Sequence, residues 1–230
     1  EARRGDLVRA IRDLRRADEL QVTGDTLWYL GWLCAEAGKM AEARRYATEA
    51  VSVDPLLWFC RWSHAFVALL DGEFETARTR WRDAADVKSG GPTHVFFLAI
   101  FAAYAGRMDE ACDLFGQVAA AGASALSPVS VAIMALFRRD TDAAAELLSS
   151  QPLRDIARLD KEFSWWLAAA CSYVGKTDEA LHWLANSIDL GFVNHHFFSQ
   201  IDPFLAALRG DARFEALMEH AREKQRAFEL

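Results

Sequence analysis

Few residues in this sequence combine the types and the spacing that catalysis or metal binding requires. His195 and His196 form the one adjacent pair of histidines. On a helix, neighbouring side chains point about 100° apart, which is a poor geometry for holding a single metal ion. His64 stands at a position that is aliphatic in the corresponding parts of the chain, so we expect it to be packed and hydrogen-bonded rather than to act as a ligand. The histidines therefore predict no metal site.

The four cysteines, Cys34, Cys60, Cys112 and Cys171, are isolated from one another along the chain. Without CxxC spacing they predict neither a zinc site nor a disulfide framework, and reduced thiols fit a cytoplasmic location. The sequence also contains no phosphate-binding glycine loop, no HExxH motif and no nucleophile elbow. We therefore expect no catalytic residues, no metal and no cofactor, and we interpret the protein as a non-enzyme.

Charge and hydropathy argue against two classes of partner. The net charge of −7 is unfavourable for binding nucleic acid. Arginines are frequent near the N-terminus, but Asp6 and Asp13 interrupt them, which favours a solvated helix face over a specific anionic partner. The longest strongly apolar stretch, residues 95–105, is too short to span a bilayer. We expect neither nucleic acid nor a membrane as the partner.

The most regular pattern in the chain is a column of alanines, separated by 33, 34, 34, 33 and 36 residues. The column consists of Ala10, Ala43, Ala77, Ala111, Ala144 and Ala180. A glycine lies five residues before each alanine, except that Arg139 precedes Ala144. A fixed period near 34 residues is typical of a stacked array of helical hairpins rather than of one globular core.

Each unit of this pattern predicts two helices. In the first unit, Leu27 and Cys34 lie at helical spacing, Gly38 ends the first helix, and Asp54 before Pro55 ends the second. Five units are predicted to start near residues 24, 58, 92, 125 and 161, after a half repeat at 1–23, so that the array covers residues 1–192. The fourth unit is the weakest, because it lacks the glycine and because Pro152 is expected to shorten its second helix.

The columns resemble the tetratricopeptide repeat (TPR) over roughly residues 5–190. The residues that carry the resemblance are Leu30, Gly31, Gly38, Ala43, Ala50 and Pro55 in the first unit, and Leu98, Ala99, Gly106, Ala111 and Phe115 in the third. Cysteine or alanine stands where the family often has tyrosine, at Cys34, Ala68, Ala102 and Cys171. The resemblance implies an all-α fold, a right-handed superhelical α-solenoid of helix-turn-helix repeats.

Both ends of the chain depart from the repeat. Gly5, Ala10 and Leu14 match the second half of a unit, so we expect a fragment of a longer protein; the alternative is a different cap in place of the first helix. Residues 193–230 are predicted to form a C-terminal helical cap, with a helix start at Asp202 and Pro203 and a long helix over 212–228. The run 201–214 resembles the closing segment of repeat regions in large bacterial signalling proteins.

The cap is expected to cover the last repeat with its apolar side chains, while its charged side chains face water. These apolar side chains are Phe204, Leu205, Leu208, Phe214 and Leu217.

A second stripe on the first helix of each unit supplies the candidate partner-binding residues. In TPR proteins this stripe lines the concave groove, and here it is aromatic and aliphatic. The candidates are Trp28, Trp32, Trp62, Phe66, Phe96, Ile100, Tyr104, Ile133, Phe137, Trp165 and Tyr173. The lysine and asparagine clamp with which family members hold a carboxylate tail is absent. Two interpretations stay open: an apolar binding groove, or a superhelix that fills its own groove with these side chains.

The first functional hypothesis is a non-enzymatic protein–protein interaction module within a larger bacterial regulatory protein. Its partner would be a protein or peptide with an apolar or amphipathic segment, anchored by aromatic side chains. The alternatives are a sensory domain that encloses a small apolar ligand, and a structural spacer or dimerisation arm, which leaves a homodimer open.

Overall fold

The computed structural model describes residues 7–84, 91–122 and 126–228, and every regular element in them is helical. The all-α prediction is therefore confirmed. The chain divides into two compact units. Unit 1 comprises Glu1–Ser89, Gly191–Asp202 and Met218–Leu230, and unit 2 comprises Gly90–Leu190 and Pro203–Leu217.

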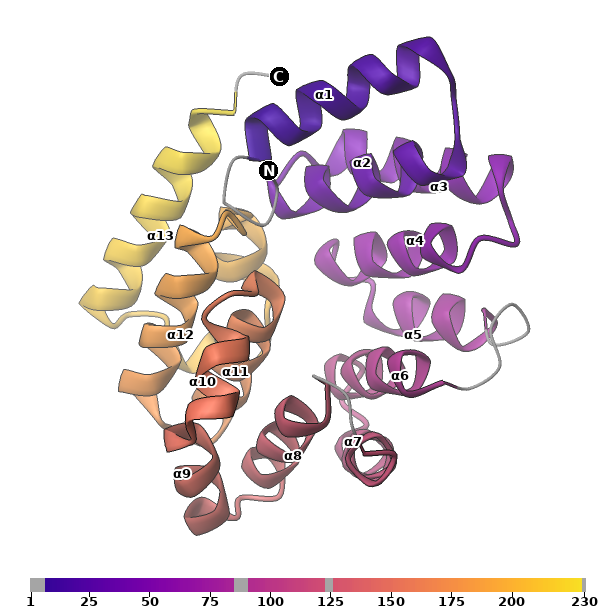
Figure 1. Ribbon diagram of the computed structural model, residues 1–230. Coiled ribbons are helices and arrows are strands. Elements are labelled where there is room, and N and C mark those ends of the chain that lie inside the picture. The colour runs from indigo at the N-terminus through magenta and orange to yellow at the C-terminus, as the bar shows by residue number, and fades with distance from the viewer. Residues whose placement is uncertain (1–6, 85–90, 123–125, 229–230) are drawn as a thin grey trace. The chain divides into compact units, whose positions relative to one another are not determined.

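Unit 1 is built from helical hairpins that stack in chain order (Figure 1). Its helices are α1 (Leu7–Leu20), α2 (Gly24–Glu36), α3 (Met40–Val53), α4 (Trp58–Leu70) and α5 (Phe74–Arg82). Helix α2 packs on α3 and also on α4, so that each hairpin buries its apolar side against the next. The long C-terminal helix α13 (Ala212–Arg226) contributes its first residues to unit 2 and the rest, from Met218, to unit 1.

Unit 2 repeats the hairpin plan with one irregularity. Its helices are α6 (Pro92–Tyr104), α7 (Met108–Ala120), α8 (Leu126–Phe137), α9 (Thr141–Ser149), α10 (Gln151–Ala157), α11 (Lys161–Tyr173) and α12 (Thr177–Asp189). As the sequence predicts, α9 ends ahead of Pro152. The short helix α10 then starts, with the proline in its first turn, where the missing N–H costs no hydrogen bond.

The alanine column is buried wherever it occurs. Ala43, Ala77, Ala111, Ala144 and Ala180 are all 0% exposed. Small side chains at these positions let the two helices of a hairpin approach closely. In the first hairpin α3 approaches α2 closely at Gly31, because a Cβ placed there would lie 3.2 Å from the Ala47 backbone nitrogen. The same Cβ would lie 2.8 Å from Ser63 Oγ on α4, so the next hairpin also packs closely at this position.

The turn inside the fourth unit contains Arg139, the residue that breaks the glycine column. Arg139 has φ of 58°, the left-handed conformation that glycine adopts in the other units, for example 75° at Gly106. An L-residue with a Cβ pays about 1–2 kcal/mol for this conformation. The Arg139 guanidinium lies 5.2 Å from the centre of the Tyr173 ring, a cation–π contact that offsets part of this cost.

The segment between α12 and α13 is less regular than predicted. A π-helical turn η3 covers Phe197–Ile201, and Pro203 begins no α-helix. The chain instead makes i→i+3 hydrogen bonds such as Ala206 N–H to Pro203 O, and forms only the 3₁₀ turn η4 (Ala206–Leu208). The expected helix start is thus wrong, whereas the long helix after it, α13, is present.

Candidate interaction surface

In unit 1 the predicted stripe forms a continuous series of ring contacts on α2 and α4. The ring centres of Trp28 and Trp32 are 6.1 Å apart, one helical turn along α2. Trp32 meets the Trp62 ring edge-on at 5.7 Å, and Trp62 stacks on Phe66 at 4.9 Å. Asp25 accepts a hydrogen bond from Trp28 Nε1 at 3.2 Å, which orients the first indole of the series.

Two further aromatic residues belong to this cluster and were not among the predicted site residues. Phe59 stacks on Trp28 with ring centres 4.4 Å apart, and the Tyr29 ring lies 5.3 Å from that of Trp32. Each stands three residues before a predicted tryptophan, and this i, i+3 spacing was the available signal. We call Trp28, Tyr29, Trp32, Phe59, Trp62 and Phe66 the aromatic ladder.

The ladder has a buried side and an accessible edge. Trp28, Trp62 and Phe66 are buried. Tyr29, Trp32 and Phe59 are half-buried, so part of each ring remains open to solvent. The accessible edge is therefore an aromatic surface that packs against other aromatic rings.

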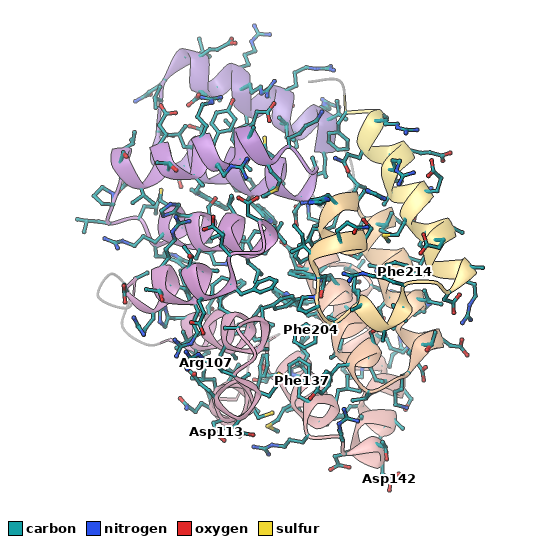
Figure 2. The ribbon with its side chains drawn as sticks, turned by 180° about the vertical axis from the view of Figure 1, so that it is seen from behind. Arg107, Asp113, Phe137, Asp142, Phe204 and Phe214 are labelled. Carbon is teal, nitrogen blue, oxygen red and sulfur yellow. The ribbon has the colours of Figure 1, made fainter. Side chains whose placement is uncertain are left out.

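In unit 2 the corresponding stripe encloses a side chain from outside the repeats. Phe204 lies between rings from α6, α8 and α11, as Figure 2 shows for Phe137. Its ring centre is 4.8 Å from that of Tyr104, 5.5 Å from that of Phe137 and 5.9 Å from that of Tyr173. Phe204 is only 8% exposed. The sequence assigns Phe204 to the last repeat alone, whereas the structure places it against rings of three successive first helices.

The remaining predicted residues of unit 2 are part of its packing. Phe96 is buried and contacts Trp166 at 5.0 Å and Phe115 at 5.7 Å. Ile100, Tyr104, Ile133 and Trp165 are buried as well. Phe137 and Tyr173 are half-buried. Most of the candidate stripe is thus packed within the fold, and its reachable rings are Trp32 in unit 1 and Phe137 and Tyr173 in unit 2.

The thiols are buried and held in their protonated form. Burial raises the pKa of Cys34, Cys60 and Cys171 to about 12, and it also raises that of Cys112. Since the thiolate is the reactive form, these side chains act as small apolar groups. Within the residues that the structure describes, no cluster of three or more His, Cys, Asp or Glu side chains could hold a metal ion.

His64 is less enclosed than the sequence suggests. Its side chain is half-buried, and Arg80 Nη1 donates to the His64 backbone oxygen at 3.2 Å. Partial burial, followed by the positive charge of Arg80, lowers the pKa of His64 to about 4. The imidazole is therefore neutral at pH 7.

These features define a class of protein: an α-helical repeat array with a buried column of small residues and an aromatic inner stripe. Comparison with solved structures identifies the type of repeat. A chain in the crystal structure of the APC/C hetero-tetramer Cut9–Hcn1 matches with a TM-score of 0.62 and 16% identity, over 99% of this chain and 44% of that one. A tetratricopeptide repeat protein from Parabacteroides merdae matches with a TM-score of 0.52 and 16% identity, over 95% of this chain and 93% of that one.

The protein has the TPR fold. At this level of identity the likeness concerns the fold alone. The chain spans less than half of the Cut9–Hcn1 chain that it matches. No protein-family model matches the sequence, and no curated protein is significantly similar to it. Among the described helices, none has the length and apolar character that crossing a bilayer would require.

Proposed function

We propose that the protein is a non-enzymatic interaction module that binds an apolar or amphipathic segment of a partner protein on the aromatic ladder. The observation that carries this proposal is the docking of Phe204 in unit 2. There the inner stripe of three repeats accepts an aromatic side chain from a segment that is not itself a repeat.

The stripe of unit 1 is also built from aromatic rings on the first helices of successive repeats, and it offers half-buried rings to an incoming side chain. Tyr29, Trp32 and Phe59 would supply the edge and face contacts that Phe204 finds in unit 2. Aromatic residues that are already immobilised lose little conformational entropy on binding, which is why they are frequent anchors of interfaces. A partner segment with an exposed Phe, Leu or Trp is the expected ligand.

The cellular setting is also a proposal. The resemblance of residues 201–214 to the closing segment of repeat regions in large bacterial signalling proteins supports a regulatory protein of the bacterial cytoplasm. In that setting the array would recruit a partner to an attached effector and would catalyse no reaction of its own.

Peptide selection followed by matched variants tests the binding site. Peptides selected on the purified protein from a random library are expected to contain aromatic or aliphatic anchors. Their affinity, measured by fluorescence anisotropy, should fall about tenfold or more in Trp32→Gln and in Phe59→Gln, because both remove an anchor ring. Leu56→Ala is the control, since Leu56 is an exposed apolar residue outside the ladder.

Equal affinity of the selected peptides for the wild type and both ladder variants would exclude the ladder as the site. Stability separates this outcome from unfolding. Trp32→Gln should keep a thermal transition near that of the wild type, whereas Trp165→Gln should lose several kcal/mol, about 3–5, because Trp165 is 0% exposed.

A further inference from the structure

The C-terminal segment of the chain returns to the first repeat within unit 1. Val193 N–H donates to Glu36 O at 2.9 Å, and Asn194 Nδ2 donates to Ala35 O at 2.9 Å, so this segment binds the last carbonyls of α2. The next residue, His195, donates its backbone N–H to Gln225 Oε1 on α13 at 3.1 Å. These bonds join residues that are distant in the sequence.

Helix α13 also touches the turn between α2 and α3. The side-chain amide of Gln225 lies directly against Gly38, in the space that a Cβ at this position would take. Gly38 has φ of 73°, and the next residue, Lys39, is the N-cap of α3. The turn between α2 and α3 therefore packs against the last turns of α13 through Gln225.

A hollow of about 370 Å³ lies where these segments meet, lined by Lys39, His195, Arg222, Gln225 and Arg226. Three of the five lining side chains are cationic and none is acidic, in a protein whose net charge is −7. The volume falls at the lower end of the range that small-molecule sites occupy, about 300–1,000 Å³.

The cations are oriented but only partly neutralised. Arg222 Nη1 donates to Glu219 Oε2 at 2.7 Å, and Arg226 Nη1 lies 4.0 Å from the other oxygen of the same carboxylate. Arg222 Nη2 lies 3.0 Å from His195 Nε2, and because a guanidinium can only donate, the imidazole nitrogen is the acceptor. One carboxylate thus serves two guanidinium groups.

The charge balance indicates the ligand. Lys39, Arg222 and Arg226 place three positive charges around the hollow, and one carboxylate, Glu219, pairs with both arginines. The N-terminus of α3 adds its partial positive charge at Lys39. A phosphate monoester is close to a dianion at neutral pH, and its oxygens suit the planar donor fork of arginine.

We propose that this hollow is a binding site for the phosphate group of a small phosphorylated molecule. The bound phosphate would bridge Lys39 on the first repeat to Arg222 and Arg226 on α13. It would therefore stabilise the docking of the C-terminal segment on the repeat, because a ligand that binds only the docked state favours that state. The site shares no residue with the aromatic ladder.

Calorimetric titration of the whole chain tests the proposal, with inorganic phosphate and glucose 6-phosphate as probes and acetate at equal ionic strength as the anion control. We expect both phosphate probes to bind and to raise the melting temperature, and acetate to do neither. Arg222→Met and Lys39→Met should each weaken phosphate binding about tenfold or more, because each removes a charge-assisted contact. Arg45→Met changes the net charge equally on α3 but does not line the hollow, and it should bind like the wild type.

Absence of binding by both phosphate probes overturns the proposal, as does an equal loss of affinity in Arg45→Met and Lys39→Met, which would indicate only a general charge effect. Lys39→Met addresses the case in which Arg222→Met disturbs α13, and circular dichroism checks both variants for helix content. Ladder variants such as Trp32→Gln should leave phosphate binding unchanged, so this experiment can fail or succeed independently of peptide binding.

Discussion

Phe204 is the side chain on which the packing of the inner stripe of unit 2 depends, and truncating it to alanine has a calculable effect. Its ring is 8% exposed and contacts the rings of Tyr104, Phe137 and Tyr173. Replacing a buried phenylalanine by alanine costs about 3–5 kcal/mol, from lost burial and from the cavity that remains. The residues after Phe204 form only a 3₁₀ turn, which can relax into the space, so we expect the lower end, about 3 kcal/mol.

Thermal and urea unfolding measure this loss. A change of about 3 kcal/mol should lower the melting temperature by roughly 6–12 °C in a chain of this size. Intrinsic fluorescence should report the same transition, because the Trp165 ring lies 5.6 Å from that of Tyr104. Leu159→Ala is the control, since Leu159 is an exposed apolar residue of unit 2.

Phe204→Leu separates the contribution of the ring–ring contacts from the contribution of apolar burial. Leucine fills much of the volume but makes no ring–ring contacts, so this variant should lose about 1–2 kcal/mol, less than Phe204→Ala. A loss below about 1 kcal/mol for Phe204→Ala, or the same loss as for Leu159→Ala, would refute the inference that Phe204 is a structural part of the stripe.

Substitutions at three further positions test other parts of the fold. Arg139→Gly should stabilise the protein by about 0.5 kcal/mol in urea unfolding, because relief of the left-handed strain exceeds the lost contact with Tyr173. Arg139→Ala keeps the backbone strain but loses the contact, so it should be less stable than the wild type. Ala111→Leu should cost about 1–3 kcal/mol by overpacking the third hairpin, and an unchanged melting temperature would contradict close helix contact there. The pKa of His64 is lowered to about 4 in the folded chain. Between pH 6.5 and pH 4 the unfolded chain therefore binds a proton that the folded chain does not, so the free energy of unfolding should fall as the pH falls through this interval. His64→Leu should reduce that slope in urea titrations at several pH values, and an unaltered slope would show that other groups cause it.

The helical hairpins and their register could be predicted from the sequence because their signals are local. Apolar and small residues recur at i, i+3 and i+4, and a glycine marks each turn, so each hairpin is specified within about 34 residues. The same locality explains why Arg139 could be identified as the exception before its backbone conformation was known. The prediction of a helix at Pro203 was wrong because local signals do not include the contacts that Phe204 makes with rings of α6, α8 and α11. These contacts bury Phe204 and accompany the 3₁₀ turn that stands in place of the helix.

The candidate surface was only partly predictable, for the same physical reason. Helical spacing identifies the rings that share a face, and Trp28, Trp32, Trp62 and Phe66 are indeed brought together in unit 1. Helical spacing in the sequence does not predict which of these rings a neighbouring helix will cover. That depends on how deeply the hairpins pack, and it leaves Trp32 half-buried while Trp62 is buried.

By itself, the sequence determined an all-α array of TPR hairpins, its buried alanine column and the stripe that carries the aromatic residues, since periodic patterns act over one or two helical turns. Only the tertiary structure decided which rings stay accessible and which side chain occupies the stripe of unit 2. It alone brought Lys39 together with His195 and Arg222, because their meeting depends on contacts such as that between Asn194 and Ala35, which are 159 residues apart. No local pattern encodes an encounter at that separation, and it exists only once the chain has folded back on its first repeat.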